Sequence, residues 1–325
     1  MSLDTHDRSK VVASEPSSAD QRRGKRARRQ PLPIGATTLR EHLERLGVIE
    51  GDALVVHCSM RRVGDVLGGA RGVIEALIGA VGNPGLIMMP AFTRDALMPE
   101  LPHDVDPADC ARIEQEVRGF DPTYSSCHHL GALAETFRSW PGVVRSRHPV
   151  HSLTALGPGA RDIVAHHPRD WAFGLEGPFG QLLETGRAKV LMLGSGWARC
   201  SALHTAETIA RHRRLRVLRY KDLTREEPRW MHARDVAEDR EGLFDAVGST
   251  LDQHPSMRRG KVGTADSRLI PFDDLLVTAA PIIAAELAAH GRVVERDVPT
   301  NLFPNANGRT RGQTQGRGPK RRARR

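Results

Sequence analysis

Two apolar segments separated by one helical segment limit the possible folds more than any other feature of the chain. Residues 53–57 (ALVVH) are almost continuously apolar and β-branched, which predicts a buried strand. A Gly-rich loop and a helix follow, and the apolar positions at helical spacing in that helix are Val73, Ile74, Leu77, Ile78 and Val81. Residues 82–85 (GNPG) stop the helix, and a second apolar strand begins at 86–89. Strand, crossover helix and strand within about 35 residues form a βαβ unit, so the sheet is expected to be at least partly parallel.

The remaining patterns extend this unit. Helices are expected at residues 38–46, 130–140, 160–165, 179–183, 201–213 and 271–290, the last broken or kinked at Pro281. Strands are expected at 151–156 and 189–193, and an antiparallel pair at 215–220 and 229–233. Residues 94–119 are polar and acidic without clear periodicity, which predicts an irregular lid or mobile loop. The predicted architecture is a single α/β domain with a mixed, partly parallel sheet and helices on both faces.

The formal net charge of +9 belongs to the ends of the chain. Residues 1–34 carry +4 and residues 305–325 carry +8, which leaves −3 on residues 35–304. Residues 21–30 and 308–325 lack apolar side chains to bury, so a disordered basic arm (1–34) and a disordered basic tail (305–325) are expected around one folded domain (35–304). Such ends either bind nucleic acid through its phosphates or only aid solubility. No aromatic residues interleave with the basic ones, which argues against stacking on RNA.

Cysteine and apolar patterns indicate the compartment. Cys58, Cys110, Cys127 and Cys200 are scattered, the first 30 residues contain no apolar run, and no segment approaches the roughly 18 apolar residues that cross a membrane. A reduced cytoplasm and no membrane contact are therefore expected. No metal is expected either, because neither a Cys-x-x-Cys pair nor a His-Glu-x-x-His motif is present.

His204 and Glu207 are the strongest local candidates for chemistry. The strand 189–193 runs into Gly194-Ser195-Gly196 and then into a helix for which Ser201 is the expected N-cap. Ligands in α/β folds bind beyond the carboxyl ends of the strands, and residues at i and i+3 share one helix face. A helix N-terminus disfavours an added positive charge, so His204 is expected to be neutral and able to accept a proton. The alternative is a histidine that only closes the start of the helix.

Each of the other local candidates for a functional role also has an ordinary structural explanation. The loop 64–69 either places backbone N–H groups near a phosphate or is an ordinary loop. Cys58 is either a nucleophile, paired with His57 or a more distant histidine, or a small buried thiol. The pairs His128-His129 and His166-His167 could suggest a metal site, but side chains adjacent in sequence point apart, which makes such a site unlikely.

A series of short motifs runs through the chain in a fixed order. They are Gly51-Asp52, VHCSMR (56–61), Gly68-Gly69, MPAFT (89–93), FDP (120–122), GALAETFR (131–138), Pro141-Gly142, RSRHP (145–149) with Ser152, Leu193-Gly194, Leu203-His204-x-x-Glu207 and VGTADSRLI (262–270). Together, over roughly residues 39–288, they resemble the antibiotic N-acetyltransferase family, whose best-known members are the aminoglycoside 3-N-acetyltransferases.

The resemblance implies acetyl transfer from acetyl-CoA to an amine, on a fold distinct from that of GCN5-type acetyltransferases. The catalytic histidine falls on His204, with Glu207 as its orienting partner and Asp235 as the carboxylate that would stabilise the imidazolium. Backbone N–H groups near the Gly-rich loop would stabilise the oxyanion. The residues implied to hold acetyl-CoA are His57, Ser59, Met60, Arg61, Val63, Gly64, Gly68, Gly69, Arg145, Ser146 and His148. Those implied to contact the acceptor are Phe92, Asp95 and Asp170.

Departures from the family pattern concern the acceptor. Residues 197–200 (WARC) replace the usual small polar run before the catalytic histidine, and Arg199 would place a cation near a polycationic acceptor. Three functions therefore stay open: an aminoglycoside 3-N-acetyltransferase, an acetyltransferase of the same fold acting on another amine, and a nucleic-acid-binding protein that uses its basic ends. Both a monomer and a homodimer are compatible with the sequence.

Overall fold

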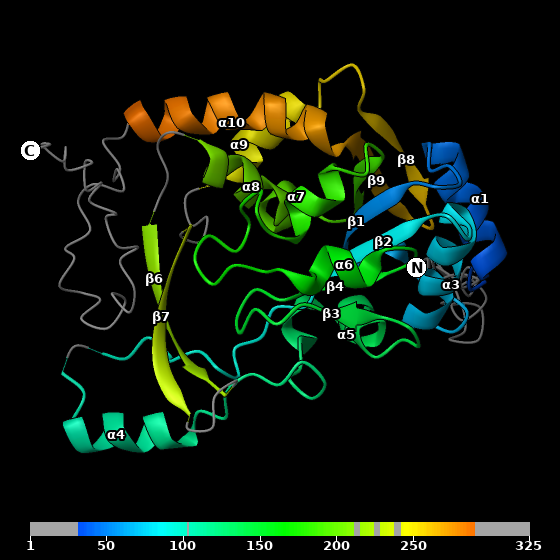
Figure 1. Cartoon of the computed structure of the whole chain (residues 1–325). Coiled ribbons are helices and arrows are strands. Elements are labelled where there is room, and N and C mark those ends of the chain that lie inside the picture. Colours follow the sequence, from blue (N-terminus) through cyan, green and yellow to red (C-terminus); the bar gives the residue numbers. More distant parts are fainter. Residues whose placement is uncertain (1–31, 103, 211–214, 224–227, 237–241, 290–325) are drawn as a thin grey trace, which may run out of the picture. The chain divides into compact units, whose positions relative to one another are not determined.

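The computed structural model describes residues 32–289 except 103, 211–214, 224–227 and 237–241 (Figure 1). The predicted basic tail and all but the last three residues of the predicted basic arm lie outside the described residues. Within the described part, no helix combines the length and apolar character needed to span a membrane.

The main sheet has seven strands in the order β3-β4-β2-β1-β5-β9-β8. Its parallel centre consists of β2 (Leu86–Pro90), β1 (Ala53–Cys58) and β5 (Ala188–Leu193), with Ala53 opposite both Leu86 and Ala188. Antiparallel strands flank this centre, namely β3 (Val144–Arg145), β4 (Leu153–Leu156), β9 (Ala265–Pro271) and β8 (Arg258–Val262). The predicted mixed, partly parallel sheet is confirmed, whereas β3, β8 and β9 were not predicted.

Helices cover both faces of this sheet, as predicted. Along β1, Ala53 and Val55 enter one core while Leu54 and Val56 enter the other, because side chains alternate along a strand. The core with Leu54, here the α3 face, is covered by α1 (Ala36–Leu46), α2 (Met60–Val63), α3 (Ala70–Val81) and α5 (Ala132–Arg138). The core with Val55, here the α8 face, is covered by α6 (Ala160–Ala165), α7 (Pro178–Leu183), α8 (Ala202–Ile209), α9 (Leu243–Leu251) and α10 (Phe272–Ala289). The helix α10 continues through Pro281, so the helix is not interrupted at this residue.

A second, two-stranded sheet pairs β6 (Leu215–Asp222) with β7 (Arg229–Val236), which confirms the predicted antiparallel pair. The predicted irregular segment 94–119 contains a helix, α4 (Pro107–Glu116), so that prediction was wrong for these ten residues. Asp106 begins α4 by accepting a hydrogen bond from the Ala108 N–H at 2.7 Å, and Pro107 occupies the first turn. Because α4 buries none of its residues, it has no apolar period for a sequence pattern to reveal.

Candidate active site

A cavity of about 600 Å³ lies where the parallel strands β1, β2 and β5 end. It is lined by residues 56–62, Met89, Pro90, Phe92, residues 129–134, residues 194–196, Arg199 and Ser201. The cavity therefore lies where the sequence analysis expects a ligand to bind, beyond the carboxyl ends of these strands.

The turn after β5 gives one wall of the cavity its shape. Gly194 has a φ of 63°, and a Cβ atom there would lie 2.8 Å from the Arg62 Cβ and 2.9 Å from the Ala265 Cβ. Only glycine fits this position, since a side chain would be both strained and crowded. The tight turn leads from β5 into the short helix η3 (Trp197–Arg199) and α8, which brings Ser201 to the cavity.

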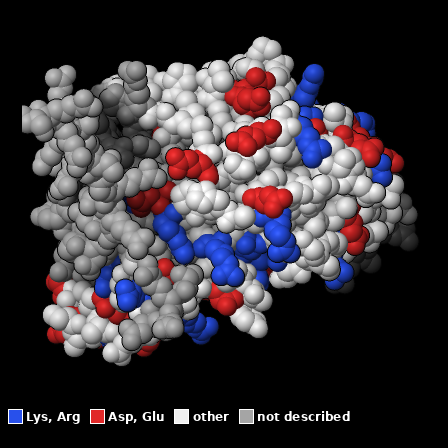
Figure 2. Space-filling view, viewed as in Figure 1, with Lys and Arg blue, Asp and Glu red and all other residues white. Residues whose placement is uncertain are grey.

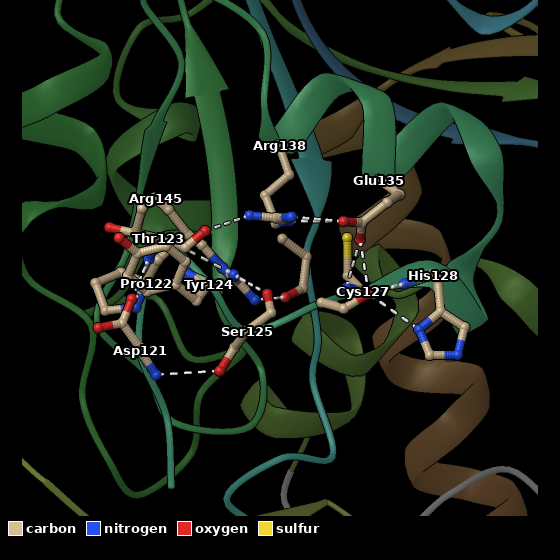
Figure 3. Close-up of polar contacts among 12 residues, drawn as sticks. Asp121, Pro122, Thr123, Tyr124, Ser125, Cys127, His128, Glu135, Arg138 and Arg145 are labelled. Atoms are coloured by element: carbon tan, nitrogen blue, oxygen red, sulfur yellow. Dashed lines mark hydrogen bonds and ion pairs between the residues drawn. The ribbon is translucent and has the colours of Figure 1, made fainter. Parts of the chain in front are cut away.

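The opposite wall, residues 129–134, is fixed by Glu135 (Figure 3). One carboxylate oxygen accepts hydrogen bonds from the Cys127 N–H at 2.6 Å and the Ser126 hydroxyl at 3.1 Å, and the other accepts from the Arg138 guanidinium. Burial alone would raise the pKa of Glu135, but the hydrogen bonds from Arg138 and from the Cys127 N–H lower it to about 2. The loop before α5 is thus tied to a permanently charged carboxylate.

The structure divides the residues that were predicted to hold acetyl-CoA. His57, Ser59, Met60 and Arg61 line the cavity, whereas the others do not. Val63 and Gly64 pack against the turn before β9 instead, where the Val63 carbonyl accepts a hydrogen bond from the Thr264 N–H at 2.8 Å.

The backbone donors of the Gly-rich loop are used inside the fold. The Gly64 N–H donates to the Met60 carbonyl at 3.3 Å, and the Gly69 N–H donates to the Val66 carbonyl at 2.9 Å. The Leu67 N–H donates to the Ile34 carbonyl at 2.9 Å. Gly64 ends α2, whereas Leu67, Gly68 and Gly69 directly precede α3, and none of the four lines the cavity.

Three of the residues predicted to hold acetyl-CoA lie outside the cavity lining and support the neighbouring backbone instead, namely Arg145, Ser146 and His148. The Arg145 guanidinium donates to the Ser152 hydroxyl at 2.9 Å and to three backbone carbonyls, and burial lowers its pKa to about 10. The Ser146 hydroxyl accepts from the Leu153 N–H at 2.9 Å. Nδ1 of the fully buried His148 accepts from the His151 N–H at 2.8 Å, and burial lowers the pKa of His148 well below 6.5. Their polar groups hold the segment that carries His151.

His204 and Glu207 lie together on α8, as their spacing predicts. The His204 Nδ1 is 3.3 Å from a Glu207 carboxylate oxygen, and Glu207 is fully buried. When Nδ1–H donates to Glu207, the Nε2 lone pair is free to accept a proton. The rings of Phe173 and Phe244 pack on the imidazole, with centroids at 4.9 and 4.8 Å. Ser201, three residues before His204, lines the cavity, whereas His204 does not.

Asp235 pairs with a different histidine. Its carboxylate is 2.7 Å from the His151 Nδ1 and fully buried, and it accepts a second hydrogen bond from the Val236 N–H. Phe173 contacts both His151 and His204, with ring centroids at 5.0 and 4.9 Å. Two histidine–carboxylate pairs therefore share one aromatic cluster. No sequence pattern singles out His151 beyond its place just after the RSRHP motif.

Of the residues predicted to contact the acceptor, only one lines the cavity. Phe92 lines the cavity and packs edge-on against His151. Asp170 is held by Arg234, which donates from its backbone N–H at 2.8 Å and from its guanidinium at 2.9 and 3.1 Å. Asp95 is exposed and lies outside the cavity lining, while Arg199 is part of it.

The visible surface carries charges of both signs. On the face shown in Figure 2, the largest group of Lys and Arg side chains forms a band across the middle, others lie near the edges, and Asp and Glu side chains are spread around the band.

Cys58 lies in the cavity wall, but burial raises the pKa of its thiol to about 12, which disfavours a nucleophilic role. Among the described residues, no group of three or more His, Cys, Asp or Glu side chains is arranged to hold a metal ion.

An α/β domain with a cavity at the ends of its parallel strands and a carboxylate-oriented histidine beside it defines the class of an acyl-transfer or hydrolytic enzyme. Comparison with known proteins narrows this class. The model of the family described as aminoglycoside 3-N-acetyltransferase matches residues 55–283. The chain belongs to this family.

Individual relatives are similar to this chain over most of its length. Aminoglycoside N(3)-acetyltransferase IX of Micromonospora chalcea is 32% identical over 276 residues, which are 78% of this chain and 95% of the relative. A solved structure of AAC-IIIb in a binary complex with CoASH has a TM-score of 0.69 and 28% identity and covers 79% of this chain and 98% of its own. AAC-VIa bound to sisomicin has a TM-score of 0.69 and 32% identity and covers 79% of this chain and 100% of its own.

Proposed function

We propose that the chain transfers the acetyl group of acetyl-CoA to the 3-amino group of a 2-deoxystreptamine aminoglycoside. The observation that carries this proposal is His204, which is oriented by Glu207 and lies three residues after Ser201 of the cavity wall. An amine must lose a proton to attack a thioester, and a neutral imidazole can take it. Loss of the amine's positive charge on acetylation would explain inactivation of an antibiotic.

The residues at the cavity fit the donor. His57, Ser59, Met60 and Arg61 supply the wall implied for acetyl-CoA, and the cavity is lined by three exposed cations, Arg61, Arg62 and Arg199. Cations suit the phosphates of CoA. On this proposal Arg199 binds the donor and does not oppose a cationic acceptor.

The acceptor is proposed to bind near the aromatic cluster of Phe92, His151 and Phe173, in which Phe173 packs on the His204 imidazole. We assign Asp235 there to the orientation of His151, and we keep Asp95 and Asp170 as candidate contacts for ammonium groups. The four cysteines are free thiols, which supports the further proposal of a cytoplasmic location.

A second candidate is the same transfer to another amine, favoured by the pairing of Asp170 with Arg234. Thiol release from acetyl-CoA, measured with a panel of aminoglycosides and unrelated amines, separates the two. Turnover with 3-amino-2-deoxystreptamine compounds is expected, and its absence together with turnover of another amine would replace the first candidate. Removal of residues 1–34 and 305–325 is expected to leave the rate unchanged, whereas a loss confined to nucleic-acid binding would assign the basic ends that role.

A further inference from the structure

Three buried side-chain atoms in the described part of the chain have no hydrogen-bond partner. They are the His57 Nε2, the Ser201 Oγ and the Thr205 Oγ1. More than about 90% of buried polar atoms in proteins are paired, so each exception calls for a reason. His57 and Ser201 are only 6% and 7% exposed, and both line the cavity, whereas Thr205 does not. His57 and Ser201 therefore each combine an unpartnered polar atom with a place in the cavity wall.

Both atoms approach from the same side of the sheet. Side chains alternate along β1, which puts His57 on the face of Ala53 and Val55. That is the α8 face, and Ser201 immediately precedes α8. The two donors thus meet the cavity from the face that also carries His204.

Ser201 is the N-cap residue of α8, as predicted, but its side chain makes no capping hydrogen bond. Its backbone is already helical, with φ −63° and ψ −19°. The hydroxyl is therefore free to donate elsewhere. Ser201, His204 and Glu207 follow one another at three-residue steps, so they lie along one face of the helix.

His57 is suited to a neutral donor. Burial lowers its pKa to about 4, so the ring carries no net charge at pH 7. With its proton on Nε2, the ring carries one N–H group that no acceptor of the described chain uses. Such preorganised donors bind a developing oxyanion more strongly than a neutral carbonyl, which is the property that accelerates acyl transfer.

We propose that the His57 Nε2–H and the Ser201 Oγ–H donate to the acetyl carbonyl oxygen and stabilise the oxyanion formed on it. The inference rests on the proposed acetyl transfer. The amine nitrogen bonds to the acetyl carbon, the carbonyl π pair moves onto oxygen, and His204 takes a proton from the amine. The carbonyl then re-forms as the C–S bond breaks, and the departing thiolate receives that proton from His204. These donors take the place of the Gly-rich loop, whose N–H groups at Gly64, Leu67 and Gly69 are already committed.

The test uses paired variants of the full chain. His57→Phe removes the donor but keeps a ring, and His57→Gln restores an N–H donor. Ser201→Ala removes the hydroxyl, and Ser201→Thr restores it. Thr205→Val is the matched control, because it removes an equally unpartnered hydroxyl that does not face the cavity. Two quantities are measured: kcat at saturating acetyl-CoA and acceptor, and the Kd of CoA by calorimetry.

Loss of one donor is expected to lower kcat about 10²–10³-fold, as removal of an oxyanion donor does elsewhere. The Kd of CoA is expected to stay near the wild-type value, and the Gln and Thr variants should recover part of kcat. Unchanged kcat, or a weaker Kd with kcat retained, would overturn the inference, the latter by assigning both groups to binding CoA. If the wild type releases thiol with no amine, the proposed function falls and this inference with it. If the wild type is active and the variants match it, only this inference falls.

Discussion

Replacement of Glu135 by Gln tests whether the cavity wall depends on one charged group. Glu135 accepts hydrogen bonds from the Cys127 N–H, the Ser126 hydroxyl and the Arg138 guanidinium. A pKa lowered from 4.5 to about 2 corresponds to about 3 kcal/mol of stability at pH 7. Because 29% of the side chain is exposed, we expect ~2 kcal/mol to be lost in Glu135→Gln.

The sign of this effect fixes its pH dependence. The folded pKa lies below the unfolded one, so the contribution is fully present above about pH 4.5 and is lost as the pH falls through about 2. The free energy of unfolding is measured by urea titration at pH 7. Affinity for CoA is measured by calorimetry and is expected to fall, because residues 129–134 lose their anchor.

Glu44→Gln is the matched control. Glu44 also pairs with an arginine on its own helix, Arg40, but the two side chains are 43% and 53% exposed. Such exposed pairs contribute about 0.3–0.5 kcal/mol. The reasoning is refuted if Glu135→Gln costs no more than Glu44→Gln, or if CoA binds the Glu135 variant as tightly as the wild type.

Three further predictions concern buried polar groups. Burial lowers the pKa of His57 to about 4 and that of His148 well below 6.5, so the free energy of unfolding should fall as the pH drops below about 6.5. His57 alone should account for a loss of ~2 kcal/mol at pH 5, and equal urea midpoints at pH 8 and pH 5 would contradict this. The pKa of about 12 at Cys58 predicts that iodoacetamide modifies it at least ~10²-fold more slowly at pH 8 than it modifies free cysteine, and rapid labelling seen by mass spectrometry would contradict the burial. Thr205→Val should raise the free energy of unfolding by ~1 kcal/mol, since an unpartnered buried hydroxyl is removed, and a loss of stability would point to an overlooked partner.

The parts of the fold that the sequence predicts are those with an apolar pattern. The strands β1, β2 and β5 are buried on both faces, so their apolar runs are continuous and easily recognised. By contrast, β8 exposes Arg258, Arg259 and Lys261, and α4 buries no side chain. Elements at the edge of the fold lack the apolar period on which such predictions depend.

The site shows the same limit. His204 and Glu207 are predictable because a three-residue step on a helix is a local relation. The partner of Asp235 is not, because His151 lies 84 residues away and no spacing selects it over His204. Arg145 resembles a ligand-binding cation in sequence, but its guanidinium donates to backbone carbonyls of residues 20–54 positions away along the chain.

The role of His204 as the base is tested most directly by one comparison of rates. Thiol release from acetyl-CoA in the presence of an aminoglycoside is measured for the wild type, for His204→Ala and for His166→Ala, which changes an exposed histidine outside the cavity lining. The account predicts that His204→Ala lowers kcat by about 10²–10⁴-fold with an unchanged urea midpoint and unchanged affinity for CoA, while His166→Ala keeps the wild-type rate. A near-normal kcat in a folded His204→Ala variant would contradict it.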